Sequence, residues 1–160
     1  MLHNYNIKIT CNYIYCYYNS DREYIKGGNS VKGYAIGTLF IRIVLGLTFF
    51  IHGLSKFQGG IEGTVGFFDS LGIPGFIAYV VAVIELIGGV AVIVGLGTRI
   101  VAALFVFVML GAIFTAKLGA PFLGGYELDI ALLAMSLHLV FAGSGTLSLD
   151  HLLKKEESYS

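Results

Sequence analysis

The chain consists of long apolar runs separated by short polar or glycine-rich connections. Four of these runs contain only one or a few ionisable residues each: Ala35–Leu54, Ile73–Leu96, Ile100–Ala116 and Gly124–Ala142. A helix needs about 17–25 mostly apolar residues to cross the hydrocarbon core of a bilayer, and all four runs meet this length. Because short loops join them, the pattern predicts an all-α integral membrane protein, an antiparallel four-helix bundle.

Glycine and proline mark the ends of the predicted helices. Pro74 lies near the start of the second helix, where its missing N–H costs little. Gly95 and Gly97 favour a tight turn before the third helix, and Thr98 is placed to cap that helix with its hydroxyl group. Gly143 ends the fourth helix.

Composition supports a membrane protein. The chain has 160 residues, of which 56% are hydrophobic and 12% are charged, whereas soluble domains carry about 25% charged residues. A soluble helical bundle is the alternative, but so few polar residues would not cover four such helices. The formal net charge is zero and no basic run occurs, so nucleic acid is not an expected partner and the lipid bilayer is.

Residues 1–33 differ from the rest, because they are rich in Asn, Tyr, Ile and Lys and lack the apolar core of a secretory signal. They are either a disordered cytoplasmic leader or an upstream stretch wrongly included in the protein, with Val31 as the true start. Residues 34–152 form the predicted membrane domain, and residues 153–160 form a short polar tail. Cys11 and Cys16 lie in the leader, at a spacing that matches no strong metal or redox motif.

The distribution of basic residues predicts the orientation of the bundle. If the N-terminus is cytoplasmic, the outer connections carry only Lys56 and Lys117, and the inner segments carry the remaining basic residues, namely Lys8, Arg22, Lys26, Lys32, Arg99, Lys154 and Lys155. Lys and Arg accumulate on the cytoplasmic side of membrane proteins. Both termini are therefore predicted to be cytoplasmic.

Two opposite charges interrupt the first two apolar runs. At about 1.5 Å per residue, Arg42 lies about 10 Å and Glu85 about 16 Å from the inner helix ends. An isolated charge at the bilayer centre costs at least about 2.5–3.5 kcal/mol, so the two are expected to meet inside the bundle. They form either an ion pair that fixes helix register, or part of a polar cavity that holds a head group or relays protons.

A second polar group is expected at the outer helix ends. His52 and Lys56 are four residues apart and share one helix face. Together with Glu127 or Asp129 they would form an acid–base cluster open to the outside, because histidine suits proton transfer near neutral pH. Ordinary membrane-edge positions are the alternative. His138, about 6 Å from the inner end of the fourth helix, is either a hydrogen-bonded interior residue or a ligand-binding one.

Cofactor motifs are not evident in the sequence. His52 and His138 lie at depths well over about 10 Å apart, which disfavours a haem held by both. No Cys/His cluster indicates a metal, and no glycine-rich fingerprint follows a strand. A quinone is the one cofactor-like molecule that remains under consideration, as a substrate.

Several motifs together resemble the DoxX family of small membrane proteins. The resemblance covers about Tyr34 to Leu152 and is carried by Arg42-Ile-Val-Leu-Gly46, Phe49-Phe-Ile-His52-Gly-Leu-Ser-Lys56-Phe57, Glu85-Leu-Ile-Gly-Gly89, Gly95-Leu-Gly-Thr-Arg99, Glu127-Leu-Asp129, Gly143-Ser-Gly145 and Leu147-Ser-Leu-Asp150. It implies a four-helix protein of the plasma membrane and an oxidoreductase function. The family that it resembles is also similar to the DoxD subunit of a thiosulfate:quinone oxidoreductase. The polar positions that it carries over are Arg42, His52, Lys56, Glu85 and Glu127.

Two functions remain from the sequence. In the first, the protein is a quinone-linked oxidoreductase, or the membrane subunit of a redox or oxidative-stress complex. Arg42, Glu85 and His138 would then bind the quinone head group, and a soluble redox partner protein or a small reductant would supply electrons. In the second, the protein is a non-enzymatic scaffold or a small-solute carrier, which as a carrier would require a homo-oligomer to enclose a path.

Overall fold

The structure is a computed structural model that describes residues 28–117, 119–145 and 148–150. The chain divides into two compact units, Met1–Tyr34 and Ala35–Ser160. Of the first unit only residues 28–34 are described, and they belong to the first helix. Both cysteines, residues 1–27 of the leader and residues 153–160 of the tail lie outside the described residues. The account below concerns the second unit.

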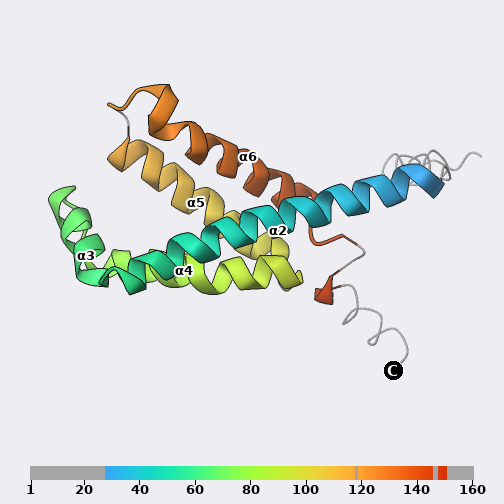
Figure 1. Cartoon of the computed structure of the whole chain (residues 1–160), viewed down its shortest axis with the longest axis horizontal. Helices are drawn as coiled ribbons and strands as arrows, with labels where there is room; N and C mark the ends of the chain where they lie inside the picture. Colours follow the sequence, from blue (N-terminus) through green and yellow to red (C-terminus); the bar gives the residue numbers. More distant parts are fainter. Residues whose placement is uncertain (1–27, 118, 146–147, 151–160) are drawn as a thin grey trace, which may run out of the picture. The chain divides into compact units, whose positions relative to one another are not determined.

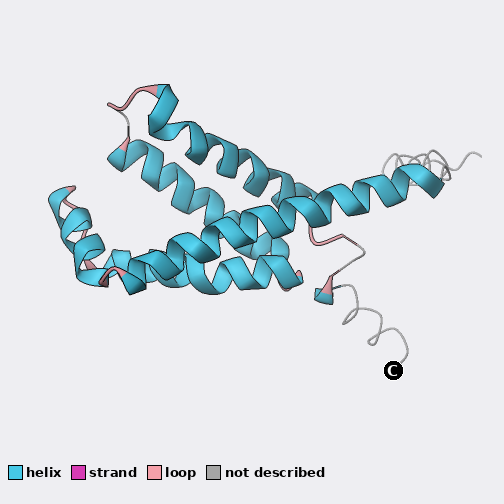
Figure 2. Cartoon of the chain, viewed as in Figure 1, coloured by secondary structure: helices cyan, strands magenta, loops and turns pink. Residues whose placement is uncertain are grey.

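All elements of the described chain are helical (Figures 1 and 2). In chain order they are α2 (Gly28–Gln58), α3 (Ile61–Ser70), α4 (Phe76–Val94), α5 (Thr98–Ala116), the irregular π-type turn η1 (Phe122–Tyr126) and α6 (Glu127–Ala142). Four stretches are long and apolar enough to cross a membrane: Gly33–Gln58, Phe76–Val94, Thr98–Ala116 and Phe122–Ala142. The prediction of an all-α membrane protein with four spanning helices is confirmed.

The short helix α3 was not predicted from the sequence. It lies between the first two spans, and none of its residues is buried. Gly60 and Gly72, on either side of it, have φ angles of 85° and 74°, values that residues with a side chain rarely adopt. These two glycines separate α3 from α2 and α4 as an independent element.

Helices α2 and α4 are in backbone contact, because glycine removes the side chains between them. A Cβ atom added to Gly46 would lie 2.6 Å from the carbonyl oxygen of Gly89, and one added to Gly53 would lie 2.6 Å from the backbone nitrogen of Leu86. Close approach through small residues is how helices pack in lipid, where hydrophobic burial does not drive association.

The other helix pair is α5 and α6, which run side by side (Figure 1). Helices α4 and α5 meet at Gly88, where an added Cβ would lie 2.9 Å from Val101 Cγ1 and 3.0 Å from Phe105 Cε1. From this contact the pair α5 and α6 diverges from α2 and α4 towards the end at which α3 lies (Figure 1).

A small apolar core joins the two pairs. The rings of Phe49 on α2 and Phe105 on α5 stack at 3.7 Å between centroids, and the remaining buried apolar members of this cluster are Leu45, Val92, Ala102, Met109, Leu132 and Leu139. The outward faces of the spans are also apolar, with Ile100, Phe107 and Phe141 among the most exposed side chains. These faces contact lipid, since an apolar surface of this extent is not stable in water.

The end of α4 and the start of α5 are held by a residue from the other end of the chain. Gly97 N–H donates a hydrogen bond to Asp150 Oδ1 at 2.9 Å, and Thr98 N–H is 3.4 Å from Oδ2. A carboxylate at the first turn of a helix accepts from N–H groups that have no partner within the helix. The prediction that the Thr98 hydroxyl caps α5 is therefore wrong, because the capping group is the Asp150 carboxylate.

Candidate functional site

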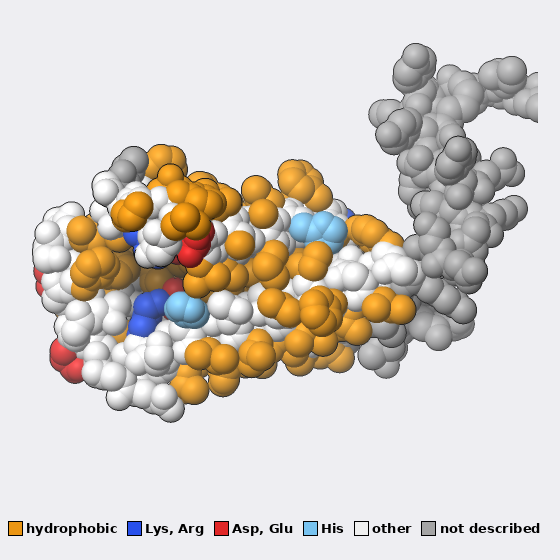
Figure 3. Space-filling model, turned by 45° about the horizontal axis from the view of Figure 1, so that its top comes forward, with side chains coloured by type: hydrophobic (Ala, Val, Ile, Leu, Met, Phe, Trp, Pro, Cys, Tyr) orange, Lys and Arg blue, Asp and Glu red, His pale blue; other side chains and the backbone are white. Residues whose placement is uncertain are grey.

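A cavity of about 700 Å³ lies between the diverging helices. Residues of α2, α3, α4, α5 and α6 line it. Cavities of about 300–1,000 Å³ typically hold small organic molecules and cofactors. Figure 3 shows basic, acidic and histidine side chains around a hollow at one end of the molecule, while hydrophobic side chains cover most of the visible face. The cavity is thus the main candidate for a ligand site in the described part of the chain.

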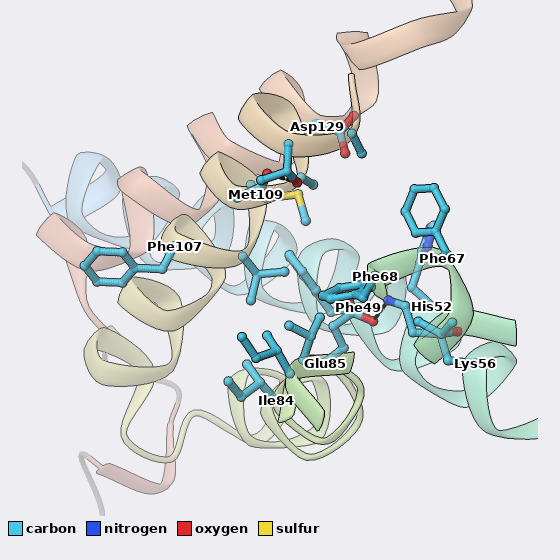
Figure 4. Close-up of a pocket in the computed structure, with 18 of the residues that line it drawn as sticks. Phe49, His52, Lys56, Phe67, Phe68, Ile84, Glu85, Phe107, Met109 and Asp129 are labelled. Carbon is cyan, nitrogen blue, oxygen red and sulfur yellow. Dashed lines mark hydrogen bonds and ion pairs between the residues drawn. The ribbon is translucent and has the colours of Figure 1, made fainter. Parts of the chain in front are cut away.

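One wall of the cavity carries an ion pair between Lys56 of α2 and Glu85 of α4, drawn in Figure 4. The side chain of Glu85 is 5% exposed and that of Lys56 is 23% exposed. The ammonium group reaches from the end of α2 back to a carboxylate near the middle of α4. A carboxylate this deep in a span requires such a partner, because an unpaired charge there is costly.

A second ion pair lines the cavity from the other helix pair. Lys117, directly after α5, lies 2.5 Å from Asp129 Oδ2 on α6, and its Nζ also donates to the Gly125 carbonyl at 3.3 Å. The side chains of Lys117 and Asp129 are 36% and 10% exposed. The sequence placed Lys117 in an outer connection, and the structure pairs it with Asp129.

His52 also lines the cavity, and its side chain is exposed. It lies one helical turn before Lys56, so both side chains are on the same face of α2. Figure 4 shows His52 and Lys56 on one side of the cavity, near Phe67 and Phe68 of α3. The structure therefore brings together His52, Lys56 and Glu85, three of the residues that the sequence proposed.

The cavity becomes apolar away from these charges. Figure 4 shows Phe107 of α5 at the side of the cavity away from His52 and Lys56. Phe107 is ten residues before Lys117, or about 15 Å along α5. The cavity therefore extends from the polar end of the bundle to about the middle of the spans.

Arg42 does not line this cavity, and the predicted pairing with Glu85 is wrong. Among the described residues, its buried guanidinium donates hydrogen bonds to the carbonyl oxygens of Val92 (from Nε, 2.9 Å), Ile93 (from Nη2, 2.7 Å) and Ser144 (from Nη1, 2.7 Å). Val92 is seven residues beyond Glu85 on α4, about 10 Å along the helix. Arg42 therefore serves the last turn of α4, whose carbonyl groups lack partners within the helix and favour a cation.

The glycine at the end of α4 makes room for this arginine. Gly95 has a φ of 78°, and a Cβ atom there would collide with the guanidinium of Arg42. The Asp150 N–H donates to the Gly95 carbonyl at 3.1 Å. Arg42, Gly95 and Asp150 therefore form one connected cluster at the opposite end of α4 from the cavity.

Glu127 and His138, two further residues proposed from the sequence, also lie outside the cavity lining. Glu127 is exposed, and its Oε1 accepts a hydrogen bond from Gly124 N–H at 3.1 Å, which stabilises the turn before α6. His138 is partly buried on α6. Asp129, which the sequence offered as an alternative to Glu127, is the acidic residue of this region that lines the cavity.

The α3 residues in the cavity wall were not predicted, because α3 has only ten residues and is too short to span a membrane. A signal was nevertheless present, since Ile61, Val65 and Phe68 follow helical spacing. Lys56 also follows buried residues of α2 at helical spacing: Thr38, Arg42, Leu45 and Phe49 precede it by 18, 14, 11 and 7 residues. This periodicity indicates an inward-facing lysine. In residues 28–117, 119–145 and 148–150, no group of three or more His, Cys, Asp or Glu side chains could hold a metal ion.

Comparisons with known proteins identify the family. The DoxX family model matches residues 37–118. The chain is 57% identical over 119 residues to "Putative oxidoreductase CatD" of Bacillus subtilis, an alignment that covers 74% of this chain and 88% of that protein. It is 33% identical over 130 residues to an uncharacterized membrane protein of Mycobacterium tuberculosis, covering 72% and 80% of the two chains.

A third relative is the inner membrane protein YphA of Escherichia coli, which is 31% identical over 125 residues, covering 70% of this chain and 86% of that protein. No solved structure matches the chain. The family match spans half of the chain, and the relatives are matched over most of their length. This multi-pass membrane protein belongs to the DoxX family.

Proposed function

We propose that the cavity binds the head group of a membrane quinone and that the protein is a quinone-linked oxidoreductase, or the membrane subunit of a redox complex. The observation that carries this proposal is the polarity of the cavity: His52 and the ion pairs Lys56–Glu85 and Lys117–Asp129 line one side of a space whose other side, between α4 and α5, is apolar. The printed name of the Bacillus subtilis relative describes an oxidoreductase, which agrees with a redox role.

The charges at the cavity suit a neutral ligand. Each lysine is balanced by a carboxylate, Lys56 by Glu85 and Lys117 by Asp129, so a neutral molecule meets no net charge there. A lysine ammonium group has three donors, which allows it to hold its carboxylate and still donate to a quinone carbonyl. An anionic or cationic ligand would instead have to displace one partner of an ion pair.

Reduction of a quinone to a quinol takes up two electrons and two protons. In this proposal His52 and the Lys56–Glu85 pair deliver the protons to the two quinone oxygens. The side chain of His52 is exposed and lines the cavity beside Lys56. The electrons come from a soluble redox partner protein or a small reductant that docks at the polar end. Arg42, Glu127 and His138 support the surrounding helices in this arrangement.

A scaffold or a small-solute carrier is the competing function. A solute crossing one chain would have to pass the stacked rings of Phe49 and Phe105, which close the cavity towards the buried core. A carrier therefore requires a path between chains of a homo-oligomer, which the cavity within one chain does not supply.

We further propose that the protein lies in the plasma membrane with both termini in the cytoplasm. Lys56 and Lys117, the two lysines on the proposed outer side, are both held in ion pairs. Arg99, at the proposed inner side, is exposed. Two Escherichia coli relatives are named inner membrane proteins, which supports the location. The polar end of the cavity then faces the outside of the cell.

The proposal is tested by purifying the protein from native membranes and measuring bound quinone by mass spectrometry. We expect quinone to co-purify with the wild type, and its amount to fall at least tenfold in Glu85→Gln. Glu127→Gln is the matched control, because it makes the same change at an acidic residue outside the cavity. His52→Ala is a second variant at an exposed position that does not support helix packing.

Wild-type protein that carries no quinone and binds none when it is added would contradict the proposal. Co-purification of a soluble protein without bound quinone would favour the scaffold function. Equal quinone loss in Glu85→Gln and Glu127→Gln would place the ligand elsewhere.

A further inference from the structure

The cavity has a second, apolar side between α4 and α5. From the contact of Gly88 with Phe105, these helices separate towards the end at which α3 lies (Figure 1). On this side the cavity is lined by Ile77, Val81 and Ile84 of α4 and by Leu104, Phe107 and Val108 of α5. All six side chains are apolar. They belong to stretches that are apolar enough to span the membrane.

Some of these lining residues also form part of the outer surface. Phe107 is 72% exposed and Leu104 is 40% exposed, although both line the cavity. They lie near the middle of α5, which runs from Thr98 to Ala116. At this depth the surroundings of an exposed side chain are lipid acyl chains. Leu104 and Phe107 therefore place the α4–α5 side of the cavity next to the hydrocarbon region.

We infer that the ligand enters sideways from the bilayer between α4 and α5, and that it is an amphiphile whose apolar chain stays in this opening while its head group reaches Lys56 and Glu85. The inference rests on the proposed quinone function and deepens it, because it selects quinones with a long prenyl chain over ring compounds without one. A cavity of about 700 Å³ has room for a drug-sized molecule and is larger than a single ring requires.

The depth of the two ends agrees with such a ligand. Lys117 lies directly after the end of α5 and Phe107 about 15 Å before it, while Lys56 reaches from the end of α2 to Glu85 near the middle of α4. A prenylated quinone with its ring at the polar end would extend its chain towards the bilayer centre through Leu104 and Phe107. A water-soluble ligand would gain nothing from this apolar side.

The absence of tryptophan from the chain provides a direct test. Leu104→Trp places the sole tryptophan at the opening, and Ile100→Trp places it four residues earlier at a lipid-facing position, 73% exposed, that does not line the cavity. Quinones quench tryptophan fluorescence on contact. In lipid nanodiscs we expect a prenylated benzoquinone to quench Leu104→Trp saturably and Ile100→Trp only in proportion to its concentration.

A further variant narrows the cavity one helical turn from Phe107 of the opening, and a second glycine variant is its control. Gly111 lines the cavity and lies seven residues after Leu104, on the same face of α5. A Cβ atom added to Gly111 would have no other atom within 4 Å. Gly111→Leu is therefore expected to fold normally and to weaken binding of the prenylated quinone at least tenfold, while the chain-free benzoquinone binds within twofold of wild type. Gly37→Leu, at an equally open glycine outside the cavity, is expected to change neither.

The outcomes separate this inference from the proposed function. Proportional quenching at both tryptophan positions, or equal weakening of both quinones by Gly111→Leu, overturns sideways entry even if quinone binds to the wild type. Wild-type protein that binds neither quinone overturns the proposed function, and the inference with it.

Discussion

Lys56, near the end of the first span, forms an ion pair with Glu85, which is buried near the middle of the second. The pair joins two helices that are also in backbone contact through Gly46, Gly53 and Gly89. A charge on each helix is therefore held where the helices have little freedom to move apart. Glu85 keeps a fixed position at the cavity wall for this reason.

The Lys56–Glu85 pair should contribute measurably to stability. Lys56→Met leaves a carboxylate that is 5% exposed, and breaking a buried pair costs about 3–5 kcal/mol. Because Lys56 is partly exposed, we expect a loss of about 2–4 kcal/mol. Reversible unfolding in mixed detergent micelles measures it. The double variant Lys56→Met/Glu85→Leu should regain most of the loss, and additive losses would contradict the coupling.

The Lys117–Asp129 pair should contribute much less. The lysine side chain is 36% exposed, and exposed pairs contribute about 0–1 kcal/mol. Lys117→Met is therefore expected to lower the free energy of unfolding by about 1 kcal/mol or less. The same unfolding assay compares it with Lys56→Met, and a larger loss for Lys117→Met would reverse the assigned importance of the two pairs.

The contact between α2 and α4 should not tolerate a methyl group. An added Cβ at Gly46 would lie 2.6 Å from the Gly89 carbonyl oxygen, so Gly46→Ala must push the helices apart. We expect it to lower the free energy of unfolding by about 1–3 kcal/mol. Gly37→Ala is the control, because nothing lies near its added Cβ and alanine favours helix by up to about 1 kcal/mol. Equal effects of the two substitutions would contradict the close contact.

Arg42 is expected to support the fold without binding the ligand. Arg42→Lys keeps the charge but loses the planar set of N–H donors that hydrogen-bond to the carbonyl groups of Val92, Ile93 and Ser144. We expect a loss of about 2–3 kcal/mol in unfolding free energy and unchanged quinone affinity of the folded protein. Reduced affinity at unchanged stability would show instead that Arg42 contacts the ligand.

The sequence predicted the spans well because their apolar composition is a property of each helix alone. The partners of the charges depend on how the helices are rotated and on the reach of each side chain, which depth alone does not give. Arg42 and Glu85 have comparable predicted depths, yet Arg42 bonds towards the far end of α4 and Glu85 bonds to Lys56. The inward spacing of Lys56 on α2 was readable, but it was interpreted as a membrane-edge position or an outer cluster.

Other features depend on contacts between distant parts of the chain. Asp150 takes the capping role expected of Thr98 because the segment after α6 returns to the start of α5. Helix α3 has ten residues and none of them is buried, so it was overlooked in a search for membrane-spanning runs, although Ile61, Val65 and Phe68 follow helical spacing. Its place in the cavity wall follows from tertiary structure.

The hydrogen bonds of Arg42 also set an order of events during biosynthesis. Its acceptors Val92 and Ser144 are 50 and 102 residues further along the chain. A ribosome adds about 5–20 residues per second, so Ser144 is translated about 5–20 s after Arg42. Until Val92 and Ile93 have been translated, the guanidinium needs water or lipid phosphate as a temporary partner. We therefore expect the first span to reach its final depth only after α4 has been inserted, and the hydrogen bond to Ser144 to form last.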